Sequence, residues 1–301
     1  MTVREEIEKL KKEKNAVILA HYYVSQEVQE LADYIGDSFY LSKVAVGLEE
    51  QTIVFCGVSF MGESAKVLNP EKTVLIPDAA ADCAMAHMAD VQTVEKMRRT
   101  YDDLAVVCYI NSTAELKSCS DVCVTSANAV RIVKALPNKN IFFIPDRNLA
   151  HYIAGLVPEK NFVYNAGYCP VHEQMKTSEI LKAKGEHPGA EVLSHPECPE
   201  KVLEMSDYIG STSGIIDYAG KSRAEEFIIC TENGVRYELE KRYPEKKFWF
   251  TDTEPVCQDM KLITPEKILH VLRTGENEVK MEEALRTTAG RPLERMLELA
   301  K

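Results

Sequence analysis

Apolar and polar positions alternate along the chain in a way that predicts strands followed by helices. Three short, largely apolar runs, at residues 17–20, 104–107 and 190–193, are typical of buried β-strands. After each run the pattern predicts a helical stretch, a short strand preceded by an aspartate, a helix, a second long strand, another helix and a last short strand. This alternation favours right-handed βαβ crossovers and parallel sheets with helices on both faces.

The same order of elements occurs three times. The segment Ala-Asp-Tyr-Ile-Gly-Asp-Ser, which begins at Ala32, returns in related form at Ser120 and Ser206, in steps of 88 and 86 residues. Pro-Glu-Lys begins at positions 70, 158 and 244, and the second long apolar runs begin at positions 53, 141 and 227, with the same two steps. Three features in one register indicate an internal repeat of about 87 residues, which is too long for a solenoid.

We therefore expect an α/β protein made of three homologous α/β/α domains, with small parallel sheets in a pseudo-threefold arrangement and the active site at the centre. The expected domains are residues 1–82, 83–168 and 169–259. Residues 260–301 have an amphipathic helical pattern and are expected to pack back on the first domain, with a surface tail as the alternative. Because no Ser/Gly-rich linker separates the repeats, the sequence favours a compact trefoil over a flexible string of domains.

Composition and charge narrow the possible functions. Of the 301 residues, 45% are hydrophobic and 28% charged, which is typical of a globular protein, and no apolar run approaches the ~18 residues of a membrane span. The first residues are charged and do not resemble a secretory signal, so we expect a cytoplasmic protein. The net charge of −11 disfavours a nucleic-acid or anionic-membrane partner, whereas a few local donors could still bind an anionic small molecule.

Three of the nine cysteines recur with the period of the repeat. Cys83, Cys169 and Cys257 follow one another in steps of 86 and 88 residues, at the ends of equivalent strands. Three thiolates that meet on the axis suit an iron-sulfur cluster in which one iron keeps an open position for Lewis-acid chemistry. The alternative is three structural cysteines in equivalent turns. The close pair Cys119 and Cys123 is weak support for a zinc site.

Two sets of polar residues share the position just beyond the first strand of each repeat, where ligands bind in open parallel sheets. The first set is His21, Tyr109 and His195, and the second set, two residues further along the chain, is Tyr23, Asn111 and Glu197. A single such residue is more often structural, but six aligned polar groups at strand ends indicate a binding or catalytic site.

A third set, Ser38, Ser126 and Thr212, is expected to close a short strand and open a helix in each repeat. One interpretation is structural, because such hydroxyls accept hydrogen bonds from the free amides of a helix as N-caps. The other is that three helix N-termini converge on the axis and offer hydroxyls and positive dipole ends to an anionic substrate.

Together these residues form a pattern that resembles the quinolinate synthase (NadA) family over essentially the whole chain. The segments that carry the resemblance are His21-Tyr22-Tyr23, Asp37-Ser38, Tyr109-Ile110-Asn111-Ser112, Thr125-Ser126-Ala127-Asn128-Ala129, Pro145-Asp146-Arg147-Asn148-Leu149, Cys169-Pro170-Val171-His172 and His195-Pro196-Glu197-Cys198-Pro199. Some family members have a Cys-x-x-Cys-x-x-Cys motif at the third cysteine. Here the stretch is Cys257-Gln258-Asp259-Met260, so the resemblance does not extend to redox regulation through that motif.

The resemblance implies that iminosuccinate (iminoaspartate) condenses with dihydroxyacetone phosphate, with loss of phosphate and two waters, to give quinolinate for NAD biosynthesis. It implies a [4Fe-4S] cluster with three cysteine ligands, Cys83, Cys169 and Cys257, and one open iron. It also implies a functional link to an aspartate oxidase or dehydrogenase that supplies iminosuccinate.

Residue roles follow from the same resemblance. His21 and His195, with Ser38, bind the carboxylates derived from iminosuccinate, and Ser126 and Thr212 bind the phosphate or the acid groups of the product.

Tyr109 and Asn111 orient the chain during carbon-carbon bond formation, and Tyr23 and Glu197 transfer protons. Two other classes of function stay open at this point: a different [4Fe-4S] hydro-lyase that acts on an anionic hydroxy acid, and a non-catalytic repeat scaffold whose aligned serines only cap helices.

Overall fold

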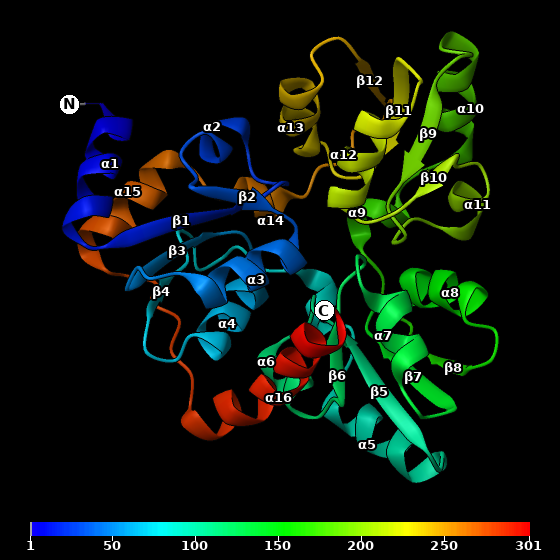
Figure 1. The fold of residues 1–301 in the computed structure, drawn as a ribbon, viewed down its shortest axis with the longest axis horizontal. Helices are drawn as coiled ribbons and strands as arrows, with labels where there is room; N and C mark the ends of the chain where they lie inside the picture. The colour runs from blue at the N-terminus through cyan, green and yellow to red at the C-terminus, as the bar shows by residue number, and fades with distance from the viewer. Residues whose placement is uncertain (1) are drawn as a thin grey trace.

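The computed structural model describes residues 2–301, which form three four-stranded sheets with all strands parallel (Figure 1). The first sheet has the order β2-β1-β3-β4 and contains β1 (Ala16–His21), β2 (Tyr34–Gly36), β3 (Thr52–Cys56) and β4 (Thr73–Leu75). The second has the order β6-β5-β7-β8 and contains β5 (Leu104–Tyr109), β6 (Val122–Val124), β7 (Asn140–Ile144) and β8 (Asn161–Tyr164). The third has the order β10-β9-β11-β12 and contains β9 (Glu191–Ser194), β10 (Tyr208–Ile209), β11 (Glu226–Cys230) and β12 (Lys247–Phe250).

Helices cover each sheet. The first unit contains α1 (Val3–Glu13), α2 (Gln26–Gln29), α3 (Ser38–Gly47) and α4 (Ser59–Leu68). The second contains η1 (Ala84–His87), α5 (Val91–Thr100), α6 (Ala114–Ser118), α7 (Ala129–Ala135) and α8 (Arg147–Leu156). The third contains α9 (Pro170–Glu173), α10 (Thr177–Glu186), α11 (Glu200–Leu203), α12 (Thr212–Lys221) and α13 (Val235–Arg242). The chain then continues through α14 (Gln258–Lys261), α15 (Pro265–Thr274) and α16 (Glu283–Leu299).

The expected fold class is confirmed. The three sheets have the same strand order and the same parallel pairing, so each is built from the same βαβ crossovers. Figure 1 shows the units as three lobes around a common centre, with the first in blue and cyan, the second in teal and green and the third from yellow-green to gold. Parallel sheets need cover on both faces, which explains why the central strands are nearly continuous apolar runs. Every residue of β1, for example, is buried.

The repeated Asp that precedes the second strand of each sheet has a structural role. Asp33, Asp121 and Asp207 each accept a hydrogen bond from the backbone amide of the neighbouring first strand, with oxygen-to-nitrogen distances of 2.7–2.8 Å. The main-chain amide of each aspartate in turn donates to the same strand residue. These bonds fix the start of the short edge strand in all three units.

The lysine of each Pro-Glu-Lys segment also has the same role in every unit. Lys72, Lys160 and Lys246 donate from Nζ to main-chain carbonyls at the C-terminal ends of α3, α7 and α12. The last carbonyls of a helix lack partners within the helix and carry partial negative charge. A half-buried ammonium group there donates the missing hydrogen bonds and neutralises part of that charge. The repeated motif is therefore explained by the capping of an equivalent helix in each unit.

The C-terminal segment contacts two units. α15 packs against α1 and β3 of the first unit, and the main chain of Asn277 and Val279 bonds to β4 and the residue after it. α16 packs against α4 of the first unit but chiefly against α6, β6 and α7 of the second (Figure 1). The domain boundaries at residues 82, 168 and 259, and the assignment of 260–301 to the first domain, stay predictions.

Within the described part of the chain, the helices are too short or too polar to cross a lipid bilayer.

The helix-capping lysines yield a stability prediction. Lys246 is half-buried and bonds to the carbonyls of Ala219 and Ser222 at 2.6 and 2.9 Å, so Lys246→Met should lower the free energy of unfolding by about 1 to 2 kcal/mol. The adjacent Lys247 is exposed and pairs with Glu226 at the surface, so Lys247→Met serves as the control and should cost less than about 0.5 kcal/mol. Urea unfolding curves of both variants measure the difference, and equal stabilities would contradict the capping role.

Candidate active site

A single cavity at the meeting point of the three units collects every site residue selected from the sequence. They are His21, Tyr23, Ser38, Cys83, Tyr109, Asn111, Ser126, Cys169, His195, Glu197, Thr212 and Cys257. Each unit contributes residues from the loops that follow its strands, because parallel strands bring all their carboxyl ends to one edge of a sheet.

The two histidines at strand ends are held in the same way. His21 ends β1, and its Nδ1 accepts the amide hydrogen of Tyr23 at 3.1 Å. His195 follows β9, and its Nδ1 accepts the amide hydrogen of Glu197 at 3.3 Å. Burial, with smaller charge effects, lowers the pKa of His21 to about 3 and that of His195 to about 4. Both rings are therefore neutral near pH 7, with the proton on Nε2. The Nε2 atom of His195 lies 3.1 Å from Ser126 Oγ.

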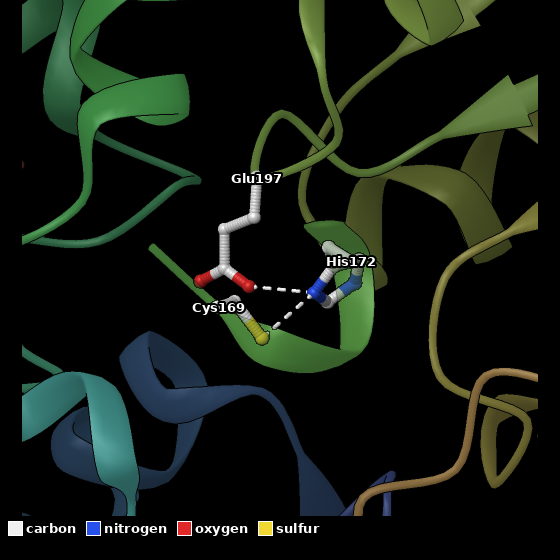
Figure 2. A group of neighbouring side chains, drawn as sticks. All are labelled: Cys169, His172 and Glu197. Atoms are coloured by element: carbon white, nitrogen blue, oxygen red, sulfur yellow. Dashed lines mark hydrogen bonds and ion pairs between the residues drawn. The ribbon is translucent and has the colours of Figure 1, made fainter. Parts of the chain in front are cut away.

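Glu197 is a buried carboxylate that lies between two hydrogen-bond donors. Its Oε1 accepts the hydroxyl hydrogen of Tyr109 at 2.6 Å, and its Oε2 lies 2.8 Å from Nδ1 of His172 (Figure 2). Burial alone raises the pKa of Glu197, but the positive charge that the neighbouring imidazoles carry when protonated, and the hydrogen bonds from His172 and Tyr109, outweigh it and bring the pKa to about 2. Glu197 is thus ionised in the folded protein.

Tyr23 and Tyr109 lie at the two ends of a hydrogen-bonded chain of side chains that runs through Thr231, His172 and Glu197. The hydroxyl of Tyr23 is 2.7 Å from Thr212 Oγ1 and 2.7 Å from Thr231 Oγ1, and Thr231 Oγ1 is 3.0 Å from Nε2 of His172. Burial, with the nearby charge of Glu197, raises the pKa of Tyr23 well above its ordinary value. The phenol therefore stays protonated and can donate a proton.

The hydroxyl set is not used for helix capping. α3 and α12 begin at Ser38 and Thr212, but their N-caps are Asp37 and Ser211, whose side chains accept from Tyr40 and Gly214. The expectation that Ser126 opens a helix is wrong. The side chain of Asn128 accepts the amide hydrogen of Thr125 at 2.7 Å and forms a turn, so that α7 begins only at Ala129.

Several polar atoms of the cavity wall have no hydrogen-bond partner among residues 2–301. They are Oδ2 of Asp37, Oδ1 of Asn111 and Oγ1 of Thr125. Buried polar atoms are normally satisfied, because each unpaired one costs about 1–3 kcal/mol. Their convergence on the cavity supports a polar ligand there.

The three cysteines have equivalent local structures. Each precedes a short helix, in the order η1, α9 and α14, and each has an extended backbone conformation. Burial raises the pKa of Cys83 to about 12 and of Cys257 to about 11, and the negative charge of one thiolate raises the pKa of another. Three thiols that interact electrostatically in a buried cavity fit an iron-sulfur cluster, whose iron ions would neutralise the thiolate charge.

Cys169 also belongs to a mixed set of possible metal ligands. Its Sγ is 3.2 Å from Nδ1 of His172, and one ligand atom from each of Cys169, His172 and Glu197 lies within 4.8 Å of the others (Figure 2). The thiol of Cys169 and the ionised carboxylate of Glu197 thus both contact the same ring nitrogen, Nδ1, of His172.

Comparison with known proteins agrees with this geometry. The model of the family described as "Quinolinate synthetase A protein" matches residues 5–298. The chain belongs to the quinolinate synthetase A family. It is 53% identical over 298 residues to a quinolinate synthase of Fusobacterium nucleatum, with 99% of each chain covered. It is 49% identical to a quinolinate synthase of Clostridioides difficile, with 98% and 97% covered, and 45% identical to quinolinate synthase 2 of Methanosarcina acetivorans, with 99% and 96% covered.

Four further polar residues lie in or beside the cavity and were not predicted from the sequence: His172, Asp146, Glu232 and Lys261. His172 is in the Cys-Pro-Val-His segment but received no role, because no equivalent histidine occurs in the other repeats. Asp146 and Glu232 occupy one repeat position, 86 residues apart, so the repeat spacing could have identified them. Lys261, which donates to the carbonyl of Tyr23 and pairs with Glu232 at 2.8 Å, gave no recognisable signal.

The buried histidines yield a pH prediction. When a histidine has a lower pKa in the folded state, the unfolded chain binds its proton first, so stability falls as the pH drops below about 6.5. Between pH 7 and pH 5, His195 should remove up to about 2 kcal/mol from the free energy of unfolding. The His195→Gln variant, which cannot titrate, should therefore lose less stability than the unmodified chain over this range.

Urea unfolding of the cluster-free proteins at pH 7, 6 and 5 measures this difference. The exposed His151 serves as the control, because His151→Gln removes an imidazole from the surface and leaves the buried rings in place. Parallel pH profiles for His195→Gln and the unmodified chain would contradict the neutral, buried imidazole.

Proposed function

We propose that the protein condenses iminosuccinate (iminoaspartate) with dihydroxyacetone phosphate to form quinolinate, with release of phosphate and two waters, in NAD biosynthesis. The observation that carries this proposal is the meeting of three cysteines and three sets of aligned polar residues in one cavity. Membership in the quinolinate synthetase A family supports the same reaction.

The cofactor in this proposal is a [4Fe-4S] cluster with Cys83, Cys169 and Cys257 as its ligands. Their equivalent positions before short helices and their shared burial support this choice. When bound, such a cluster supplies an open iron that acts as a Lewis acid toward a carboxylate or hydroxyl oxygen in the dehydrations.

Neutral donors and helix ends bind the anionic substrates. The Nε2 atoms of His21 and His195, with the hydroxyl of Ser38, are assigned to the carboxylates derived from iminosuccinate, because neutral imidazole donates a hydrogen bond without becoming charged. Ser126 and Thr212 are assigned to the phosphate or the acid groups of the product. The N-termini of α3 and α12 add positive partial charge near these groups.

Two protein groups hold and move protons. Glu197, which is ionised, removes a proton from the substrate at one of its carboxylate oxygens, and Tyr23, which stays protonated, supplies one from its hydroxyl. Tyr109 donates a hydrogen bond to Glu197 and, with Asn111, orients the reacting chain. Isomerisation and dehydration each need a proton removed and a proton supplied, so opposite protonation states in one cavity suit both steps.

The scaffold alternative loses its main support. It explains the aligned hydroxyls as helix caps, whereas Asp37 and Ser211 supply the caps of α3 and α12. We retain the cytoplasm as the proposed location and an aspartate oxidase or dehydrogenase as the proposed source of iminosuccinate, which hydrolyses readily.

The test is an anaerobic assay of the unmodified protein and of Cys83→Ala, Cys169→Ala and Cys257→Ala, with quinolinate, iron and sulfide measured on the same samples. Each substitution should remove the iron-sulfur absorbance and lower quinolinate formation at least about 100-fold, because each removes a ligand. Cys119→Ala is the matched control, since Cys119 is equally half-buried but does not line the cavity, and it should behave like the unmodified protein. Retention of both signals by all three variants would overturn the proposal.

A further inference from the structure

The main-chain amide of every cavity cysteine donates a hydrogen bond to a carboxylate. The amide of Cys83 donates to Asp82 Oδ1 at 2.8 Å, and the amide of Cys169 donates to Asp146 Oδ2 at 3.2 Å. The amide of Cys257 donates to Glu232 Oε1 at 3.0 Å. Each of the three proposed cluster ligands is therefore hydrogen-bonded, through its main-chain amide, to one acidic side chain.

The carboxylates connect equivalent loops in all three units. Asp146 and Glu232 follow β7 and β11 at the same repeat position, and each reaches across to the cysteine loop after the next strand. The first unit has Val58 at that position, and its side chain has no hydrogen-bond acceptor. There Asp82 accepts the cysteine amide instead, and the hydroxyl of Ser59, the first residue of α4, donates to Asp82. A carboxylate therefore accepts the cysteine amide in all three cases, although Asp82 comes from a different position in the repeat than Asp146 and Glu232.

We propose that Asp82, Asp146 and Glu232 are positioning residues for the iron-sulfur cluster, each of which fixes the backbone of one cysteine so that the three Sγ atoms point to the axis. This inference rests on the proposed function. The ligands come from three separate loops, so none is held in place by a local Cys-x-x-Cys turn. Charge-assisted hydrogen bonds to backbone amides are about twice as strong as neutral ones and have defined geometry, which suits them to this task.

The burial of two of these carboxylates supports a dedicated role. Asp146 and Glu232 have no exposed surface, and a buried carboxylate is costly unless its oxygens are hydrogen-bonded. Asp146 also caps α8 by accepting from the amide of Leu149 at 2.6 Å. Glu232 accepts from the amide of Gly234 and pairs with Lys261, which donates to the carbonyl of Tyr23. Glu232 therefore connects a cysteine loop with the loop of the proposed proton donor.

Outer-shell partners of metal ligands commonly contribute 10- to 100-fold to metal affinity. The test compares Asp82→Ala, Asp146→Ala and Glu232→Ala with Asp82→Asn, Asp146→Asn and Glu232→Gln. Asparagine and glutamine keep an oxygen that accepts the amide hydrogen, whereas alanine does not. The readouts are iron and sulfide per chain after anaerobic reconstitution, and the rate at which the cluster absorbance disappears when an iron chelator is added.

Each alanine variant should lose its cluster at least about 10-fold faster than the unmodified protein. Asp82→Asn keeps the single oxygen that accepts from Ser59 and from the Cys83 amide, so it should stay within about threefold of the unmodified protein. Asp146→Asn and Glu232→Gln replace one of two oxygens that accept backbone amides, so they should fall between these limits. The control is Asp121→Ala, which removes a carboxylate bond to the amide of Val106 away from the cavity and should leave cluster loss unchanged. Circular dichroism checks that each variant is folded. Asp82 is partly exposed, so Asp82→Ala remains informative even if a buried alanine variant unfolds.

The outcomes separate the two proposals. Folded alanine variants that hold the cluster as long as the unmodified protein would overturn the positioning role and leave the proposed function intact. An Asp82→Asn variant that loses the cluster as fast as Asp82→Ala would also overturn it, because hydrogen-bond acceptance by Asp82 would then not be the cause. An unmodified protein that binds no iron or sulfide would instead overturn the cofactor part of the proposed function, and the positioning role with it.

Discussion

The direction of the strands is the constraint on which the rest of this molecule depends. In each sheet the strands are parallel, so the loops that follow them lie at one edge, and three such edges face a common cavity. A chain that repeats this unit can place a single residue type at three equivalent points around one centre. No single sheet carries a complete site, because only one of the three cysteines follows the last strand of each sheet.

The repeat preserves two kinds of residue for different reasons. Asp33, Lys72 and their equivalents in the other units make the same backbone hydrogen bonds three times, since the sheet edge and the helix end recur. The cavity residues recur in position but change in type: a histidine at the end of β1 is a tyrosine at the end of β5. Structural contacts are symmetric, whereas an asymmetric substrate favours different groups from each unit.

Much of this arrangement could be predicted from the sequence, because strand ends and repeat spacing together define positions in space. Spacing alone identified residues that lie in one cavity although up to 236 residues separate them, as His21 and Cys257 show. Local turn chemistry was harder to predict. The turn formed by Asn128 delays α7, and Asp37 rather than Ser38 caps α3. His172 could not be found by repeat logic, since its role between Cys169 and Glu197 depends on a contact that only one unit makes.

The central claim is that the three units share one cluster on their common axis. It is tested most directly by a crystal structure of the anaerobically reconstituted protein, with anomalous diffraction recorded at the iron absorption edge. The account predicts an iron signal in the cavity, within bonding distance of Sγ of Cys83, Cys169 and Cys257. An iron signal held by other cysteines, such as Cys108 and Cys123, or an axis without iron in a protein that forms quinolinate, would contradict it.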